Sequence, residues 1–383
     1  MRLSILLLTV VLLFGGCVSP GKNNSNRKEQ VSYDRYFVCE GSTYAYDSLG
    51  NLQKIWYEDM VNILGSMAEG GELSEKAIAK GLGKDDVDHI FQCVMVDHPE
   101  FFYVEGYSFK TYEMASKLES LEFSGIYNVD REKAVGKKKR IEDAADQIQS
   151  EMMRGLDDYG KIKYVYETLI KNTEYREESE DSHNIYSVFV EKESVCQGYA
   201  KATQYLLNRM GVECTLAIGT VRGGGKHGWN LVKADGEYYY VDTTWGDASY
   251  RSQDSDHHDS GAVPEINYDY LCVTTAELEK THSCDHEIEM PVCTATKDNY
   301  YIRENAFFTE LDTEKLRRLF AFPDFMHADQ VSLKCADQRC YEEIYCHLIK
   351  DNHVFEYYGE DTGRVLYVLN DDQYSMTFWV TNR

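Results

Sequence analysis

Asp235-Gly236 separates two runs of β-forming residues, and this pattern restricts the fold more than any other in the chain. An Asp-Gly pair between such runs predicts a two-residue hairpin turn, and the turn fixes the register of the strands. If Ala234 pairs with Glu237, then His227 and Asp242 become diagonal neighbours on one face of the hairpin. The sequence therefore predicts an imidazole and a carboxylate within reach of each other.

A helix is expected just before this hairpin. Apolar residues at helical spacing follow Cys196, and Gly211 is a natural C-terminal stop, so Cys196 lies at the helix start. Between the helix and the hairpin, we expect a buried strand and a Gly-rich turn. The expected segments are strand 212–221, turn 222–226, strand 227–233 and strand 237–244.

The position of Cys196 is chemically informative. The partial positive charge and free N–H groups at a helix N-terminus favour a thiolate, which is the nucleophilic form, and can hold an oxyanion. Asp242 would orient His227, as the third member of a catalytic triad does. Each residue alone is more often structural, and the hypothesis rests on finding all three in one short stretch.

The rest of the chain mixes helices and strands, which indicates an α+β protein. Apolar periodicity predicts helices at 52–67, 85–96, 130–153, 158–172, 312–320 and 341–350, and strands at 101–104, 119–129, 365–369 and 377–381. At 383 residues the chain exceeds the size of one core. We expect an N-terminal mixed α/β region (33–134), a central domain (135–297) and a small C-terminal α/β region (298–383).

The net charge of −25 argues against nucleic acid as a partner, because 65 acidic side chains would repel a phosphate backbone. The N-terminus has a different character. Arg2, the apolar run 3–14 and small residues before Cys17 are typical of an export signal, and the run is shorter than the roughly 20 residues of a membrane-spanning helix. We predict a signal peptide (1–16) and a polar tether (17–32).

The 11 cysteines do not look like a disulfide framework, since setting aside Cys17 and Cys196 leaves an odd number without tight spacing. Cys335/Cys340 and Cys284/Cys293 are the local candidates for a bridge. No metal site is expected. Asp254 to Asp259 contains ligand residue types but is better explained as a solvated loop, and the last cysteines lack the paired spacing of a zinc site.

Three segments together resemble a known family. VCQGYA (195–200), HGWNLV (227–232) and YYVDTTWGD (239–247) are similar to the bacterial transglutaminase-like domain of the papain-like superfamily, over about residues 135–295. VDHPEFFYV (96–104) and KNTEY (171–175) also resemble segments of lipoprotein-type members, and Cys17 resembles the lipidated Cys of a bacterial lipoprotein signal.

The resemblance implies a papain-like core and a cysteine protease or acyltransferase without a cofactor. Cys196 would attack an acyl carbon, His227 would act as base and then acid, and Asp242 would orient His227. The Cys196 backbone N–H would be one oxyanion donor, with Tyr175 or Tyr186 as the second. Water as acceptor gives hydrolysis, which we slightly favour, and an amine gives cross-linking.

Location adds an expectation about partners. A lipid on Cys17 would anchor the protein outside the cytoplasm, where protein or peptide substrates such as cell-wall peptides occur. The alternative is a non-catalytic surface module on the same fold that binds peptide or glycan.

Overall fold

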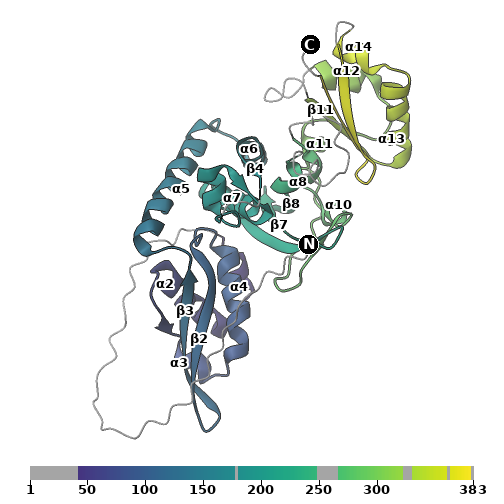
Figure 1. The fold of residues 1–383 in the computed structure, drawn as a ribbon. Helices are drawn as coiled ribbons and strands as arrows, with labels where there is room; N and C mark the ends of the chain where they lie inside the picture. The colour runs from purple at the N-terminus through teal and green to yellow at the C-terminus, as the bar shows by residue number, and fades with distance from the viewer. Residues whose placement is uncertain (1–41, 177–179, 248–265, 322–329, 360–362, 381–383) are drawn as a thin grey trace. The chain divides into compact units, whose positions relative to one another are not determined.

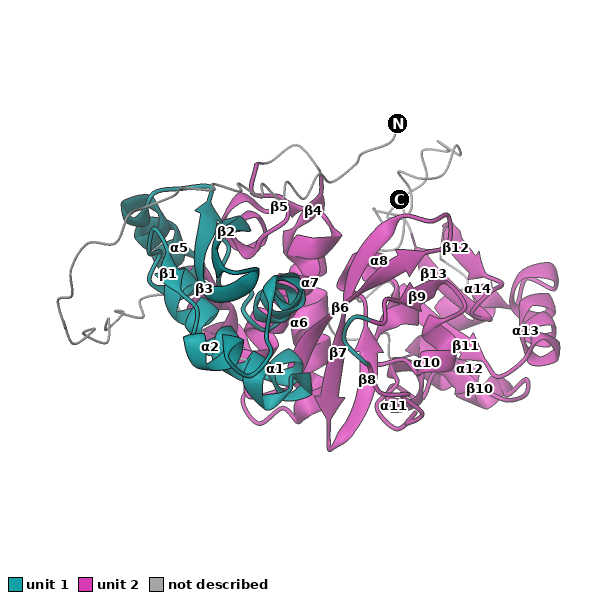
Figure 2. Cartoon of the chain, turned by 90° about the horizontal axis from the view of Figure 1, so that it is seen from below, with its two compact units in different colours: residues 1–143, 287–289 teal, residues 144–286, 290–383 magenta. Residues whose placement is uncertain are grey.

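The computed structural model describes residues 42–176, 180–247, 266–321, 330–359 and 363–380. The chain forms two compact units (Figure 2): residues 1–143 with 287–289, and residues 144–286 with 290–383. The expected signal peptide, Cys17 and the tether lie outside the described residues. Within the described part of the chain, no helix is both long and apolar enough to cross a membrane.

The first unit combines short helices with a three-stranded sheet of order β1-β3-β2. Its elements are α1 (Tyr44–Ser48), α2 (Asn51–Gly65), β1 (Gly71–Glu72), α3 (Glu75–Ile78), η1 (Lys84–Asp86), α4 (Val87–Asp97), β2 (Val104–Met114) and β3 (Lys117–Tyr127). Trp56, Phe91, Tyr103 and Phe123 are buried in its core. Aromatic side chains each bury a large apolar area, which a small unit needs.

The expected helices and second strand of this unit are confirmed within a few residues. The strand expected at 101–104 is wrong, because Phe101 to Tyr103 form a turn and β2 begins at Val104. Asp97, at the end of α4, accepts the backbone N–H groups of Ala45 and Tyr46 and thereby fixes α1. The apolar residues 101–103 therefore pack after a helix end and precede the sheet, which Val104 enters as the first residue of β2.

The long charged helix α5 (Arg131–Glu151) is confirmed, and the chain passes from the first unit to the second within it. The second unit begins with two helices and the sheet that follows them. Its first elements are α6 (Asp158–Asn172), β4 (Glu174–Tyr175), η2 (Ser187–Glu191), β5 (Glu193–Ser194), α7 (Cys196–Arg209), β6 (Cys214–Val221), β7 (Lys226–Ala234), β8 (Glu237–Val241) and α8 (Thr243–Gly246).

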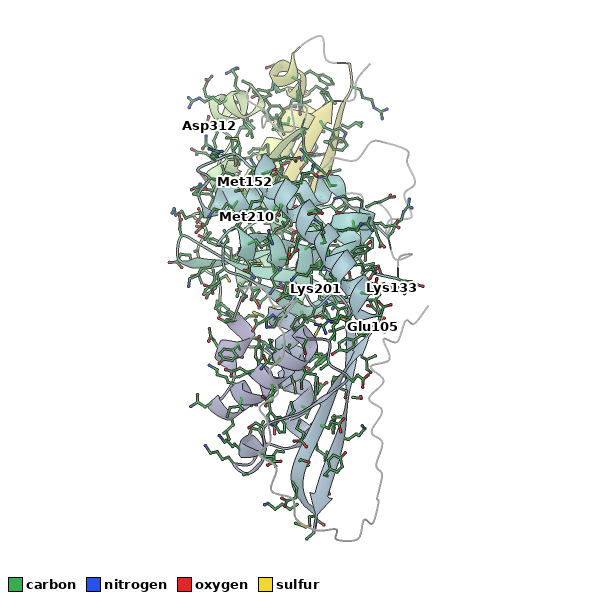
Figure 3. All side chains as sticks on the ribbon, turned by 90° about the vertical axis from the view of Figure 1, so that its left-hand side faces the viewer. Glu105, Lys133, Met152, Lys201, Met210 and Asp312 are labelled. Atoms are coloured by element: carbon green, nitrogen blue, oxygen red, sulfur yellow. The ribbon has the colours of Figure 1, made fainter. Side chains whose placement is uncertain are left out.

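The central sheet of the second unit has the order β8-β7-β6-β9, with every neighbouring pair antiparallel. Helix α7 packs on β6 and β7 (Figure 1). Figure 3 marks Lys201 within α7 and Met210 directly after its last residue. The segments that lead to the fourth strand are η3 (Tyr268–Tyr270), α10 (Thr275–Leu278), β9 (His282–Cys284) and α11 (Tyr300–Arg303).

The described residues of the C-terminal region form a second four-stranded sheet of order β10-β11-β13-β12, covered by helices. Its elements are β10 (Phe307–Phe308), α12 (Thr313–Ala321), β11 (Gln330–Cys335), α13 (Gln338–Tyr345), η4 (Cys346–Lys350), α14 (Val354–Tyr358), β12 (Val365–Asn370) and β13 (Ser375–Val380). The helices and strands expected here are confirmed, and the α+β class is confirmed for the chain.

Polar contacts join this C-terminal sheet to η3 and α10 of the same unit. The Lys334 ammonium lies 2.8 Å from Glu277 Oε1. Asp269 accepts hydrogen bonds from Asn370 and Ser375, at 2.6 and 2.8 Å. These donors come from β11, β12 and β13, so all three strands contribute to the junction.

Candidate active site

Helix α7 begins at Cys196, as the sequence predicts, and Gly211 after its end has a φ of 77°. Val195 is the N-cap residue in an extended conformation and makes no side-chain cap. Among the described residues, no backbone carbonyl accepts the amide N–H of Cys196. The partly exposed Cys196 thiol therefore lies at a helix end whose first donor is free for a ligand.

The first turn of α7 is held in place by close packing at Gly198. A Cβ there would lie 2.0 Å from Ser194 Oγ, 2.9 Å from the Ser182 carbonyl oxygen and 3.1 Å from that of Asn184. Only glycine fits, and the loop before the helix can therefore lie directly against the turn that carries Cys196.

The hairpin register that was derived from Asp235-Gly236 is confirmed: Ala234 pairs with Glu237, and Asn230 pairs with Val241. The second strand ends earlier than the expected Thr244. Asp242 follows β8 and its Oδ1 accepts the backbone N–H of Trp245 at 3.0 Å, which caps the short helix α8. This N-cap bond draws the chain into a helical turn and ends the strand.

The structure brings His227 and Asp242 together. His227 Nε2 lies 2.7 Å from Asp242 Oδ2, and the two side chains are 2% and 1% exposed. Because Nε2 faces the carboxylate, Nδ1 is the nitrogen left for Cys196, which is close enough to help raise the pKa of this imidazole. His227 and Asp242 thus have the contact that a base and its orienting carboxylate need.

The electrostatics of the pair favour opposite charges. Burial alone would lower the pKa of His227, but the charge and hydrogen bond of Asp242, with a contribution from Cys196, raise it to about 10. Burial alone would raise the pKa of Asp242, but the His227 charge and the hydrogen bonds from its imidazole partners hold it below its ordinary value. A buried carboxylate is tolerated when it is paired in this way.

A second imidazole, which the sequence analysis missed, also contacts Asp242. His282 on β9 is fully buried, and its Nε2 lies 3.0 Å from Asp242 Oδ2. In a flat sheet, β9 and β8 would be about 14 Å apart, since three strand spacings of roughly 4.8 Å separate them. The contact therefore spans the whole width of the sheet. No local sequence pattern around residues 281–285 predicts the contact between His282 and Asp242.

Aromatic rings surround the two imidazoles. The His227 ring stacks on Trp229 with centroids 6.0 Å apart, and the His282 ring lies 4.7 Å from Trp245. Trp229 is fully buried, whereas Trp245 is partly exposed. These rings exclude water from the pair, which strengthens its electrostatic interactions.

Tyr175 and Tyr186 lie on segments that flank the start of α7. Tyr175 in β4 pairs with Ser194, and its ring is 6.4 Å from Tyr199, one helical turn beyond Cys196. Tyr186 is 6% exposed and directly precedes η2. Their roles as oxyanion donors stay predictions, as do the catalytic roles of the triad and the lipidation of Cys17.

Among the described residues, one group has the side chains to hold a metal ion: His227, Asp242 and His282. Both imidazoles already lie within hydrogen-bonding distance of the same carboxylate oxygen, which satisfies all three groups without an ion. The acidic segment 254–259, weighed as a ligand cluster, lies outside the described residues.

The cysteines of the two candidate bridges are free thiols in the structure. Cys335 and Cys340 are buried near each other, and burial raises the pKa of both. Cys284 and Cys293 are also unbridged, and burial raises the pKa of Cys293 to about 12. They resemble buried apolar residues in this respect.

Comparison with known families supports the assignment of the central region. Residues 146–243 match the sequence model of the transglutaminase-like superfamily. This range contains Cys196, His227 and Asp242, and it confirms the resemblance found in the sequence. His282 lies outside the matched range. A search of curated proteins found no match.

Several solved structures share weaker similarity. One is a crystal structure of a TGase (13% identity, TM-score 0.28, covering 40% of this chain and 55% of the other). Another is a candidate cysteine protease from Cytophaga hutchinsonii (12% identity, TM-score 0.25, covering 37% and 66%). A third is a candidate protease from Parabacteroides distasonis (11% identity, TM-score 0.22, covering 35% and 39%). The chain thus spans about half to two thirds of the first two, and the family assignment rests on residues 146–243.

Proposed function

The chain carries a transglutaminase-like core over residues 146–243, and from this premise we propose that it is a cysteine enzyme that transfers acyl groups through a thioester on Cys196. The observation that carries the proposal is the buried contact of 2.7 Å between His227 and Asp242 beside a helix-start cysteine. A module that only binds ligands has no need for this arrangement.

In the first half of the reaction, Cys196 Sγ attacks the carbonyl carbon of a peptide or side-chain amide. The thiol proton moves to His227 Nδ1, and the carbonyl oxygen becomes an oxyanion that accepts the free N–H of Cys196. When the C–N bond breaks, His227 returns the proton to the leaving amine. Asp242 holds the proton on Nε2 throughout, so Nδ1 remains the catalytic nitrogen.

In the second half, an acceptor attacks the thioester, and His227 takes its proton and passes it to the departing sulfur. Water as acceptor releases a carboxylic acid, and an amine forms a new amide. We favour hydrolysis slightly, because bulk water competes wherever the site does not exclude it. Incubating the enzyme and a glutamine peptide with a labelled primary amine distinguishes the reactions by the mass of the product.

Tyr175 and Tyr186 are the proposed sources of a second oxyanion donor. Tyr175→Phe and Tyr186→Phe remove one hydroxyl each and keep the ring. Loss of one oxyanion donor lowers kcat on the order of 10²-fold or more. Unchanged turnover in both variants would remove this part of the proposal.

We further propose that a lipid on Cys17 anchors the enzyme outside the cytoplasm, where a cell-wall peptide or a surface protein is its substrate. The signal-like pattern of residues 1–17 supports this placement. Cys17→Ala should move the protein from the membrane fraction to the soluble fraction. Retention of the variant in the membrane fraction would contradict lipid anchoring at this residue.

The first experiment is the rate of iodoacetamide alkylation at Cys196 between pH 4 and 9, located by peptide mass spectrometry, in wild type and His227→Ala. Cys346 is also partly exposed and lies far along the chain, so it is an internal reference in the same digest. We expect Cys196 to react at pH 6, where a free thiol with a pKa of about 8.5 does not. The variant should lose this reactivity.

If Cys196 follows the profile of Cys346 in both proteins, the nucleophilic site is refuted. Cys196→Ala then separates an enzyme from a binding module. Loss of turnover with peptide binding retained supports the enzyme, whereas full biological activity of the variant supports the module.

A further inference from the structure

We propose that His282 is a positioning residue of this site. Its imidazole donates a hydrogen bond that keeps the Asp242 carboxylate ionised and fixed in direction, so that the proton on His227 Nε2 always has this carboxylate as its acceptor. The inference rests on the proposed function and adds a fourth residue to it. His282 lies outside the segment matched by the family, and its role follows from contacts in the structure.

The donors around Asp242 define the protonation of His282. Oδ2 lies 3.0 Å from His282 Nε2 and 2.7 Å from His227 Nε2, while Oδ1 accepts the Trp245 N–H. An ionised carboxylate only accepts hydrogen bonds, so both imidazoles must carry a proton on Nε2. Three donors converge on one carboxylate that is 1% exposed. They replace the water that this group loses on burial.

The other nitrogen of His282 is also satisfied. Thr281 Oγ1 lies 2.8 Å from His282 Nδ1 and 3.3 Å from the Tyr270 hydroxyl. Thr281 Oγ1 also lies 3.3 Å from the Leu278 carbonyl oxygen, so its hydroxyl group is held on three sides. Hydrogen bonds thus link Tyr270 through Thr281 and His282 to Asp242, and the members of such chains strengthen one another.

The backbone of His282 is fixed by strand pairing. His282 pairs with Val221 on β6, and Ser283 pairs with Thr220. A Cβ at Gly219 would lie 2.0 Å from the Ser283 carbonyl oxygen and 2.8 Å from the Trp229 ring. Glycine is therefore needed for β9 to approach this closely.

The His282 ring is also confined. Its centroid lies 5.0 Å from that of Trp229 and 4.7 Å from that of Trp245, on different elements of the unit. Tightly packed rings leave few alternative rotamers. His282 can thus impose a direction on Asp242, since its own position is set by β6, Trp229 and Trp245.

The consequence concerns the proton between His227 and Asp242. A buried carboxylate with one partner can become protonated, and it would then no longer require the proton on His227 Nε2. With His282 and Trp245 as additional donors, the carboxylate stays ionised. His227 then keeps its Nε2 proton and presents Nδ1 to Cys196.

Two substitutions separate this role from packing alone. His282→Gln places an amide N–H near the former Nε2 position and does not titrate, whereas His282→Phe keeps a ring but has no donor. The assay is the alkylation of full-length protein by iodoacetamide at Cys196 from pH 4 to 9, with Cys346 as the reference thiol. Loss of a hydrogen bond to a charged group corresponds to about tenfold or more. We expect His282→Phe to react at least about tenfold more slowly at pH 6 and to approach the wild-type rate near pH 9.

His282→Gln should retain a profile close to that of the wild type. A folded His282→Phe protein with an unchanged profile would overturn the proposal, and so would a His282→Gln protein that behaves like His282→Phe. Thr281→Val provides a further test if His282→Phe does not fold. It removes the hydroxyl partner of Nδ1 and should give a smaller loss at pH 6, and an unchanged profile would count against the chain of hydrogen bonds.

The two proposals fail in different ways. If the proposed function is wrong, wild-type Cys196 itself shows the profile of an ordinary thiol. If only the role of His282 is wrong, wild-type Cys196 reacts at pH 6 and His282→Phe does so equally well.

Discussion

Asp242→Asn is the substitution that tests the electrostatics of the site most directly. The side chain keeps its shape but exchanges one carboxylate oxygen for an NH2 donor. Oδ1 faces the Trp245 N–H and Oδ2 faces two imidazoles, so the NH2 group meets a donor in either orientation. With the NH2 group at the Oδ2 position, His227 is driven to the tautomer with its proton on Nδ1, which cannot accept the thiol proton. With the NH2 group at the Oδ1 position, it opposes the Trp245 N–H and breaks the cap of α8.

The magnitude follows from the pKa of His227, which burial would lower and the Asp242 pair raises to about 10. Compared with the ordinary 6.5, the rise of about 3.5 corresponds to ~5 kcal/mol in favour of the imidazolium, at 1.36 kcal/mol per pKa unit. His227 is only 4% exposed, so solvent screening reduces this value little. In the variant, burial remains and the carboxylate charge is gone. We therefore expect alkylation of Cys196 at pH 6 to fall on the order of 10³-fold.

Stability gives a second measurement of the same effect. A group whose pKa is raised on folding stabilises the protein fully below its unfolded pKa, and this contribution is lost as pH rises through the folded pKa. For His227 the window runs from pH 6.5 to about 10. Because the pKa of Asp242 is lowered in the fold, its own contribution is lost in acid, below its ordinary value of 3.8. In urea denaturation, the difference in free energy of unfolding between wild type and Asp242→Asn should therefore be largest between about pH 4 and 6.5 and should shrink toward pH 10.

Asp269→Asn is a matched control, because Asp269 is a buried carboxylate that accepts three side-chain donors outside this site. It should lower stability and leave the alkylation profile of Cys196 unchanged. An Asp242→Asn protein that reacts at the wild-type rate at pH 6, or a pH-independent stability difference, would refute the reasoning.

Three further substitutions test packing and burial by urea denaturation. Gly198→Ala puts a Cβ 2.9 Å from the Ser182 carbonyl oxygen and should lower the free energy of unfolding by roughly 1–3 kcal/mol, whereas Gly136→Ala in the exposed part of α5 should not lower it. Lys201 has no ion pair with a described residue, and burial lowers its pKa from 10.5 to about 8, so Lys201→Met should add about 3 kcal/mol at pH 7. Relative to Lys201→Met, the wild type should gain stability between pH 8 and 10.5, and parallel profiles would contradict this. Lys334→Met leaves Glu277 without its partner at 2.8 Å and should lower the free energy of unfolding by about 3 kcal/mol. Adding Glu277→Gln to this variant should restore part of the lost stability. An undiminished loss in the double variant would argue against the ion pair.

Local rules predicted much of the candidate site. The start of α7 at Cys196 follows from apolar spacing and from Gly211, and the hairpin register follows from Asp235-Gly236. Both depend on residues close together in the chain, where turn chemistry and side-chain periodicity act directly. Local rules failed at Phe101 to Tyr103 and beyond Val241, because turn and capping bonds there overrode β-propensity.

The sequence by itself determined the helix-start cysteine and the pairing of His227 with Asp242. Only the tertiary structure decided that His282, 40 residues beyond Asp242, reaches the same carboxylate oxygen. That contact spans a sheet in which β8 and β9 stand at opposite ends of the strand order, and it depends on close approach at Gly219. Which side chains meet across a sheet depends on its twist and on packing across the whole unit, so no short segment encodes the contact.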